Sequence, residues 1–445
     1  MTNLSTCLPY GWSSANSNAD GVSILFYTTW TDMAIRMDRS QYDLIEGLVD
    51  LLHRGDHSTF NALDVWGPGM KGWDAQQDTA TNIGRRITCC PSLIVWNAPR
   101  PEPHVPTAST PGGRNGGTRE PLIPERCRGK TEVMVLVGDC NVDPADCRLQ
   151  LSLTGATIWA HNHWHLMLSA AWLPPPAVLL YNSPFCAVGQ SSAHPRIAEA
   201  MQEVLLNPQK RSGIVAFGIR RPFYRLRTRI HGLIANGKLP HARYNPHPSP
   251  NKRERRAGPK TRHHILTSHN VTYDVLKRET CGYNPLSPTF VQHVDTSLEL
   301  VSTMGQARIC IFDAGVQRKM LRKYMHAFAL GCVPAADIPD DMPPAARRAV
   351  IRLDPDWTDE RLAQTLELAY NDVARLGRLR AVGRRLFEST YSCTAVAEDM
   401  LDMIEAKREG RAGRFWSNTG HTLGCEARFQ NNASLPLFPW CHEVA

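Results

Sequence analysis

A basic turn between residues 313 and 323 is the part of the sequence best suited to bind an anion. Asp313 and Gly315 end an apolar run, and the cations Arg318, Lys319 and Lys323 follow. In an open parallel sheet, anions bind where a strand ends, because turn amides and the start of the next helix point there. The spacing therefore predicts a diphosphate site, with a solvated basic helix face as the alternative.

A second basic turn follows the apolar run GIVAFGI, residues 213–219. Gly218 lies near the end of this run, and Arg220, Arg221 and Arg225 come after it. Guanidinium groups match phosphate oxygens in geometry and charge, so we expect this turn to contact the same ligand. An acidic partner, or simple solvation of the next helix, would explain the same arginines.

Two segments supply candidate general bases. His161 and His163 belong to HNHWH, and Asp74 ends the segment DVWGPGMKGWD. A neutral imidazole or a carboxylate can remove a proton from an acceptor hydroxyl, so these three residues are the candidates. Hydrogen-bonded turn histidines are the alternative. Alternating histidines also suit a metal, but no fourth ligand is evident nearby and no metal site is predicted.

The segment DVWGPGMKGWD, residues 64–74, is also a candidate acceptor site. Trp66 and Trp73 offer aromatic faces on which a sugar can stack, whereas Gly67 and Gly69 allow the backbone to approach a ligand closely. A loop packed by its own tryptophans is the alternative.

The composition is that of an ordinary globular protein. The chain has 445 residues, a net charge of +8, 42% hydrophobic residues and 21% charged residues. These values exclude a collagen-like chain, wholesale disorder and a polytopic membrane protein, and the length predicts two or three domains. The positive charge suits either a nucleic-acid binder or a protein that handles anionic substrates.

The termini and cysteines predict a cytoplasmic location. The first twenty residues lack the basic and apolar regions of a secretory signal, and no run reaches the roughly 18 apolar residues that a membrane span requires. Thirteen cysteines lie scattered, with only Cys89 and Cys90 adjacent and no C-x-x-C. This pattern predicts reduced thiols rather than a disulfide framework.

Apolar runs alternate with helical periodicity along most of the chain, which predicts an α/β architecture with mostly parallel sheets. The strands of the first half are expected at 22–30, 92–97, 133–138, 156–161 and 177–182, with a helix at 41–53. Those of the second half are expected at 213–219, 263–268, 307–313, 332–337 and 350–353, with helices at 316–330, 359–376 and 394–407.

Changes in composition predict the domain limits. Residues 1–20 are expected to be a disordered N-terminal tail and residues 408–445 a C-terminal tail, and the proline- and glycine-rich residues 99–129 a disordered insertion. The N-terminal Rossmann-like domain would cover residues 21–207 and the C-terminal one residues 208–407.

Several segments together resemble a known family. RKMLRKYMHAFALGCVPAADIP (318–339), VIRLDPDW (350–357) and FESTYSCTAVAEDML (387–401) are similar to the C-terminal half of group 1 glycosyltransferases of the GT-B fold. The nearest branch is that of spore-maturation glycosyltransferase-like proteins, which DVWGPGMKGWD and YNSPFC (181–186) also resemble. The resemblance spans roughly residues 22–404.

This resemblance implies two Rossmann-like domains that face each other across a cleft. The second domain would bind a nucleoside-diphosphate sugar, and the first a hydroxyl acceptor, with no further cofactor. Many retaining members carry a pair of glutamates at the places where this chain has Arg318 and His326. A catalytically inactive binding or scaffold protein of the same fold is therefore one alternative, and a basic nucleic-acid-binding protein is another.

Overall fold

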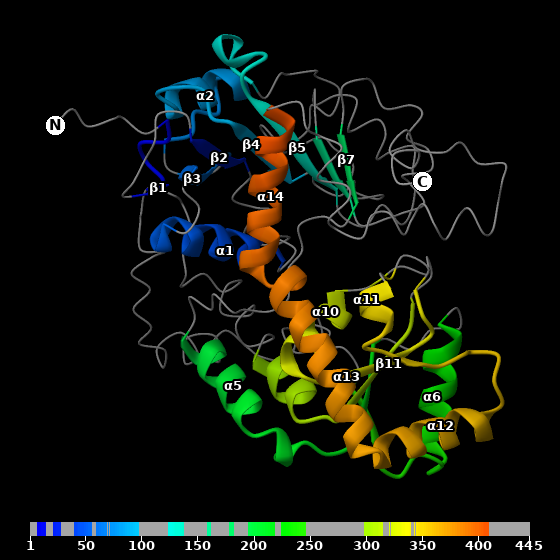
Figure 1. Ribbon diagram of the computed structural model, residues 1–445. Coiled ribbons are helices and arrows are strands. Elements are labelled where there is room, and N and C mark those ends of the chain that lie inside the picture. The colour runs from blue at the N-terminus through cyan, green and yellow to red at the C-terminus, as the bar shows by residue number, and fades with distance from the viewer. Residues whose placement is uncertain are drawn as a thin grey trace, which may run out of the picture.

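The computed structural model describes residues 7–14, 21–27, 40–55, 59–68, 70, 72–97, 123–137, 158–161, 178–181, 195–218, 224–245, 298–314, 320, 322–339, 342 and 344–408. Its elements form two sheets covered by helices (Figure 1). The predicted α/β class with two mostly parallel sheets is confirmed.

The first sheet has the order β1-β3-β2-β4-β5-β6-β7. Its strands are β1 (Trp12–Ser13), β2 (Val22–Tyr27), β3 (Phe60–Trp66), β4 (Leu93–Asn97), β5 (Glu132–Val137), β6 (Ile158–His161) and β7 (Val178–Tyr181). Only β1 is antiparallel to its neighbour. Every residue of β2 is buried, as expected of a central strand covered on both faces. Helices α1 (Ser40–Arg54) and α2 (Thr79–Arg86) belong to this half.

The second sheet has the order β12-β11-β10-β8-β9, and all its pairs are parallel. Its strands are β8 (Ile214–Phe217), β9 (Ala242–Asn245), β10 (Ile309–Phe312), β11 (Val333–Ala336) and β12 (Ile351–Arg352). Helices of this half are α5 (Pro195–Leu206), α6 (Arg225–Ala235), α10 (Arg322–Leu330), α11 (Pro344–Arg347), α12 (Asp359–Asn371) and α13 (Val373–Leu386).

Strand alternation divides the core of the second half between the two faces of its sheet. In β10, Ile309 and Ile311 belong to a cluster with the apolar residues of α6 and α12. Cys310 and Phe312 belong to the other cluster, which includes the buried residues of α10. Both faces are therefore covered by helices, so that only the ends of the strands remain for a ligand.

The last described helix, α14 (Cys393–Arg408), joins the two halves. It follows α13 and the short π-helix η6 (Phe387–Tyr391), and it packs on α1 and β2 of the first sheet (Figure 1). A side chain at Gly47 of α1 would lie 2.6 Å from the Cys393 carbonyl oxygen, so glycine permits this close approach. The Thr59 hydroxyl also donates a hydrogen bond to Glu405. One hydrophobic cluster consequently includes residues of both halves.

The structure differs from the predicted elements in several places. Residues 64–66, expected in a loop, form the buried end of β3. The helix expected at 359–376 ends at Asn371, because the carboxylate of Asp372 caps the separate helix α13. Residues 123–129 of the expected disordered insertion contain the 3₁₀ turn η2 (Glu125–Cys127). Within residues 1–20, expected to be a disordered tail, β1 pairs with β3, and Leu8 and Trp12 are buried. The strand expected at 263–268 and the C-terminal tail beyond residue 408 lie outside the described residues, and the domain limits remain predictions.

The prediction of reduced thiols is wrong for seven described cysteines: six form the disulfides Cys7–Cys89, Cys90–Cys127 and Cys310–Cys332, and Cys393 is also disulfide-bonded. The Cα atoms of these three pairs lie 4.6, 5.2 and 5.9 Å apart, within the usual range for disulfides. Spacing along the sequence could not reveal these pairs because folding brings the partners together. Disulfides persist mainly in oxidising compartments, and the cytoplasmic location stays a prediction.

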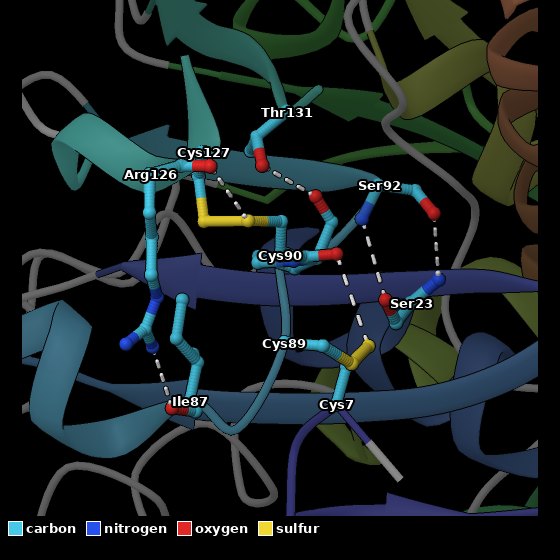
Figure 2. The surroundings of a disulfide bond; sticks show 10 residues. Cys7, Ser23, Ile87, Cys89, Cys90, Ser92, Arg126, Cys127 and Thr131 are labelled. Atoms are coloured by element: carbon cyan, nitrogen blue, oxygen red, sulfur yellow. Dashed lines mark hydrogen bonds between the residues drawn. A yellow bond between two sulfur atoms is a disulfide. The ribbon is translucent and has the colours of Figure 1, made fainter. Parts of the chain in front are cut away.

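Two of these disulfides form a clasp at the amino ends of β4 and β5, through the adjacent residues Cys89 and Cys90 (Figure 2). Arg126 of η2 donates to the Ile87 carbonyl oxygen over 3.0 Å, and the Thr131 hydroxyl donates to the Pro91 carbonyl over 2.7 Å. The clasp thus links the segment before β1, the α2–β4 connection and η2. Along the described parts of the chain, no helix is both long and apolar enough to cross a membrane.

Candidate functional site

The second sheet has a topological switch point between β8 and β10. From β8 the chain continues to β9 on one side of it, and then returns to β10 on the other. Ligands of open α/β sheets bind beyond the carboxyl ends of the strands at such a point. Gly218 follows β8 and Asp313 follows β10, so two of the predicted donor-site residues lie where the topology favours binding.

Gly218 is required by its own surroundings. It has a φ of +115°, and a Cβ atom there would lie 2.6 Å from the guanidinium carbon of Arg227 in α6. The carbonyl oxygen of Gly218 accepts a hydrogen bond from the Tyr244 hydroxyl. A close approach therefore exists at this glycine, and it accommodates an arginine of the following helix.

Arg227 connects the two strand ends. Its Nη2 lies 2.6 Å from Oδ1 of Asp313, and the two side chains are only 8% and 4% exposed. The guanidinium carbon also lies 3.9 Å from the ring centroid of Tyr224. On the other side of Asp313, the amide of Ala314 donates to Oδ1 of Asp337, at the end of β11, over 2.8 Å. Arg227 of α6 and Asp337 at the end of β11 therefore fix the turn after β10 on its two sides.

Lys323, in the first turn of α10, adds a second cation to this turn. Burial lowers its pKa to about 8, and the charge of Arg227 lowers it further, whereas Asp313 acts in the opposite direction. These influences place Lys323 within electrostatic range of both members of the ion pair. His326, one turn later in α10, is buried at 6% exposure, so it belongs to the packed side of the helix.

A pocket of about 590 Å³ lies at the carboxyl ends of β11 and β12. Sequence reasoning did not single out its polar residues, which are Asp337, Arg347, Arg352, Asp354 and Asp356. The available signal was VIRLDPDW, in which a short apolar strand ends in two aspartates. Since Asp337 accepts the Ala314 amide, the pocket adjoins the turn that contains Asp313.

Arg225 forms an exposed ion pair with Asp356, one of the polar residues that line the pocket, and this pair connects the start of α6 with the β12–α12 connection. Five other predicted donor residues lie outside the described residues, and their roles remain predictions: Gly315, Arg318, Lys319, Arg220 and Arg221. Of the predicted set, the structure thus brings together Gly218, Asp313 and Lys323 around Arg227, which was not predicted.

Aromatic residues gather at the carboxyl end of β3 in the first sheet. The rings of Trp66 and Trp73 lie 4.9 Å apart, and those of Tyr27 and Trp73 lie 5.9 Å apart. Trp66 is only 2% exposed, whereas Trp73 is partly exposed. Any acceptor that stacks on this cluster would therefore use Trp73. Gly67 follows β3 directly, and Gly69 lies outside the described residues.

The polar residues beneath this cluster form a buried ion pair that the sequence did not reveal. Nε of Arg86 lies 2.7 Å from Oδ2 of Asp64, and Nη2 lies 3.1 Å from Oδ1. Asp64 is fully buried in β3, and Arg86 is 8% exposed in α2. The guanidinium of Arg86 also contacts the rings of Tyr10 and Trp66. The pair therefore fixes α2 against the strand that carries Trp66.

The candidate bases lie in different settings. The Asp74 carboxylate accepts the Gln76 amide and pairs with Arg85 at 3.2 Å, and its backbone exchanges hydrogen bonds with Asn82. These contacts stabilise the turn before α2. His161 ends β6, and His163 lies outside the described residues. In the described parts of the chain, no three His, Cys, Asp or Glu residues are close enough to hold a metal ion.

No family model and no curated protein matches this sequence. Similar solved structures include the N-terminal domain of Candida albicans trehalose-6-phosphate phosphatase, with a TM-score of 0.45 and 9% identity over 86% of this chain and 97% of that chain. Anabaena HepE in complex with UDP-glucose has a TM-score of 0.44 and 9% identity, over 86% of this chain and 99% of that chain. A Rickettsia africae glycosyltransferase has a TM-score of 0.44 and 10% identity, over 90% of this chain and 100% of that chain. At this level of similarity, function must be inferred from the residues of this protein.

Proposed function

We propose that this protein is a glycosyltransferase that moves a sugar from a nucleoside-diphosphate donor to a hydroxyl acceptor. The observation that carries the proposal is the pocket at the carboxyl ends of β11 and β12, beside the turn that follows β10. Its volume of about 590 Å³ falls among those of pockets that hold small ligands and cofactors. The sequence resemblance to group 1 glycosyltransferases agrees with this placement, and the narrower spore-maturation branch remains a prediction.

The polar groups around the pocket suit the parts of such a donor. Asp337 and Asp354 provide carboxylate oxygens, which accept hydrogen bonds from ribose hydroxyls. Arg347 and Arg352 provide guanidinium groups that can bind phosphate oxygens. The nucleoside would then occupy the pocket, and the diphosphate would extend towards Asp313 and the switch point.

Sugar transfer releases a nucleoside diphosphate, so negative charge develops on the leaving group. Preorganised cations at that position stabilise the transition state more than the bound substrate. Arg227 and Lys323 are the described cations at the switch point, and a pKa of about 8 leaves Lys323 mostly protonated at neutral pH. An incoming diphosphate would favour the protonated form further, since an anion raises the pKa of a neighbouring ammonium.

Calorimetric titration with UDP, GDP, UDP-glucose and GDP-mannose tests the donor site. We expect saturable binding of at least one nucleotide, weakened about tenfold or more by Arg352→Gln, since a charge-assisted phosphate contact contributes about 1.5–3 kcal/mol. Arg243→Gln is the matched control, because Arg243 is equally an exposed arginine on an edge strand, at the opposite side of the sheet. Absence of binding to every nucleotide, or equal weakening by both variants, would refute the proposal.

An inactive binding protein of the same fold is the second candidate, because the buried His326 lies where many family members carry a carboxylate. It would bind the nucleotide sugar without turnover. Release of the nucleoside diphosphate, measured with a panel of sugar and lipid acceptors and with water alone, separates the two. Steeply salt-dependent binding to RNA or DNA, with no preference among nucleotides, would instead favour a nucleic-acid-binding protein.

A further inference from the structure

Three arginines without a described carboxylate partner meet at the C-terminal end of α10, where Arg384 of α13, which pairs with Glu388, also donates to the Ala329 carbonyl oxygen. Arg211 precedes β8, Arg308 precedes β10, and Arg380 lies in α13. Nη1 of Arg211 donates to the Leu330 carbonyl oxygen over 2.6 Å, and Nε of Arg380 donates to the Gly331 carbonyl over 2.9 Å. Nε of Arg308 donates to the carbonyl of Arg211 over 3.0 Å. This arginine cluster lies at the amino ends of the strands, opposite the candidate donor site.

The cluster concentrates positive charge without a described counter-charge. None of the three arginines pairs with a carboxylate among the described residues. Burial lowers the pKa of Arg211 to about 10, and the charge of Arg380 lowers it further. Burial and the charge of Arg308 likewise lower the pKa of Arg380. The C-terminus of α10 offers only about half a negative charge, which is small beside three guanidinium charges.

The hydrogen bonds of the cluster leave its outer donors available. Arg308 and Arg380 donate through Nε only, so in the described structure their terminal nitrogens have no hydrogen-bond partner. The backbone acceptors fix the direction of both guanidinium groups, and the Arg308 guanidinium also lies 4.9 Å from the ring centroid of Tyr370. Arg211, only 3% exposed, forms the buried base of the cluster.

We propose that the arginine cluster is a second anion site, which binds a phosphate group, either free or as the monoester of a small metabolite. Two oriented guanidinium groups can each donate two parallel hydrogen bonds to a tetrahedral oxyanion. A dianion would balance most of the charge that α10 leaves uncompensated, whereas a single carboxylate would balance less. The site is separate from the proposed donor pocket, because it lies at the other end of the strands.

Thermal unfolding in sodium phosphate and in sodium chloride of equal ionic strength tests this proposal. Phosphate should raise the Tm of the protein saturably, and chloride should not reproduce the rise. Arg308→Gln and Arg380→Gln should each weaken phosphate binding at least tenfold, since each removes a charge-assisted contact. Equal effects of the two salts on the Tm of the unchanged protein would overturn the proposal. This comparison does not depend on whether the variants fold.

Two control variants test whether the phosphate effect arises at the arginine cluster. Arg378→Gln removes the same charge from the solvent-exposed side of α13 and should keep the phosphate effect. Arg243→Gln removes the same charge from the exposed edge strand β9 and should also keep it. Loss of the effect in either control would refute a site at the arginine cluster. Repeating the titration with glycerol phosphate identifies the source, because binding of inorganic phosphate alone assigns the site to the free ion.

Discussion

Gly218 and Arg227 provide a quantitative test of how the switch point is built. An alanine at a φ of +115° costs about 1–3 kcal/mol in backbone strain alone. Its methyl group would also lie 2.6 Å from the guanidinium carbon of Arg227, which must then move away from Asp313. Removing one partner of a buried ion pair costs about 3–5 kcal/mol, and a displaced guanidinium loses part of that. We therefore expect Gly218→Ala to destabilise the protein by about 3–5 kcal/mol in total.

The double-mutant cycle separates these two contributions. In an Arg227→Ala background, no guanidinium is present to be displaced, so Gly218→Ala should cost only the backbone strain of about 1–3 kcal/mol. The free energy of unfolding is measured by urea denaturation, with circular dichroism and tryptophan fluorescence as independent probes. If Gly218→Ala costs the same in both backgrounds, within about 0.5 kcal/mol, the close approach of Arg227 does not constrain this glycine.

Three further changes test other parts of the structure. Because burial lowers the pKa of Lys323 from 10.5 to about 8, the folded state loses this proton first, so the free energy of unfolding should rise between these two pH values. Lys323→Met should abolish that rise and stabilise the protein at neutral pH, and an unchanged pH profile in urea would count against the lowered pKa of this ammonium. Replacing both Cys90 and Cys127 by serine should lower the free energy of unfolding by about 2–4 kcal/mol. Peptide mapping of the unchanged protein without reductant should recover the two cysteines linked, so free thiols at these positions would disprove the bond. Arg86→Met should cost about 3–5 kcal/mol because it leaves the buried Asp64 charge unpaired, and adding Asp64→Leu should recover much of that loss in thermal denaturation.

The sequence predicts the strands that form continuous apolar runs and misses those that do not. The strands β2, β8 and β10 are continuous apolar runs, which is what burial on both faces requires. The edge strand β9 has the partly exposed sequence ARYN, which carries no such signal. One reason why strand β3 was missed is that Asp64 interrupts its apolar run. Only the tertiary contact with Arg86 explains a carboxylate at this position.

In the candidate site, too, residues that local sequence patterns mark could be predicted, whereas contacts between residues far apart in the sequence could not. Gly218 and Asp313 could be predicted, because the ends of parallel strands can be read from local patterns. The role of Arg227 could not be predicted, because its partner Asp313 lies 86 positions away in the sequence. The clasp was missed for the same reason, because Cys7 and Cys89 are 82 positions apart in the sequence. Local sequence patterns carry little information about such partners.

The position of α14 has a consequence for how the protein is made. The ribosome completes β1 to β7 and α1 long before it reaches residues 393–408, yet α1 is covered by α14. Until then, the side of α1 that carries Gly47 lacks its native cover. The first half of the nascent chain must therefore wait for nearly all of the second, which extends the period in which chaperones can act on it.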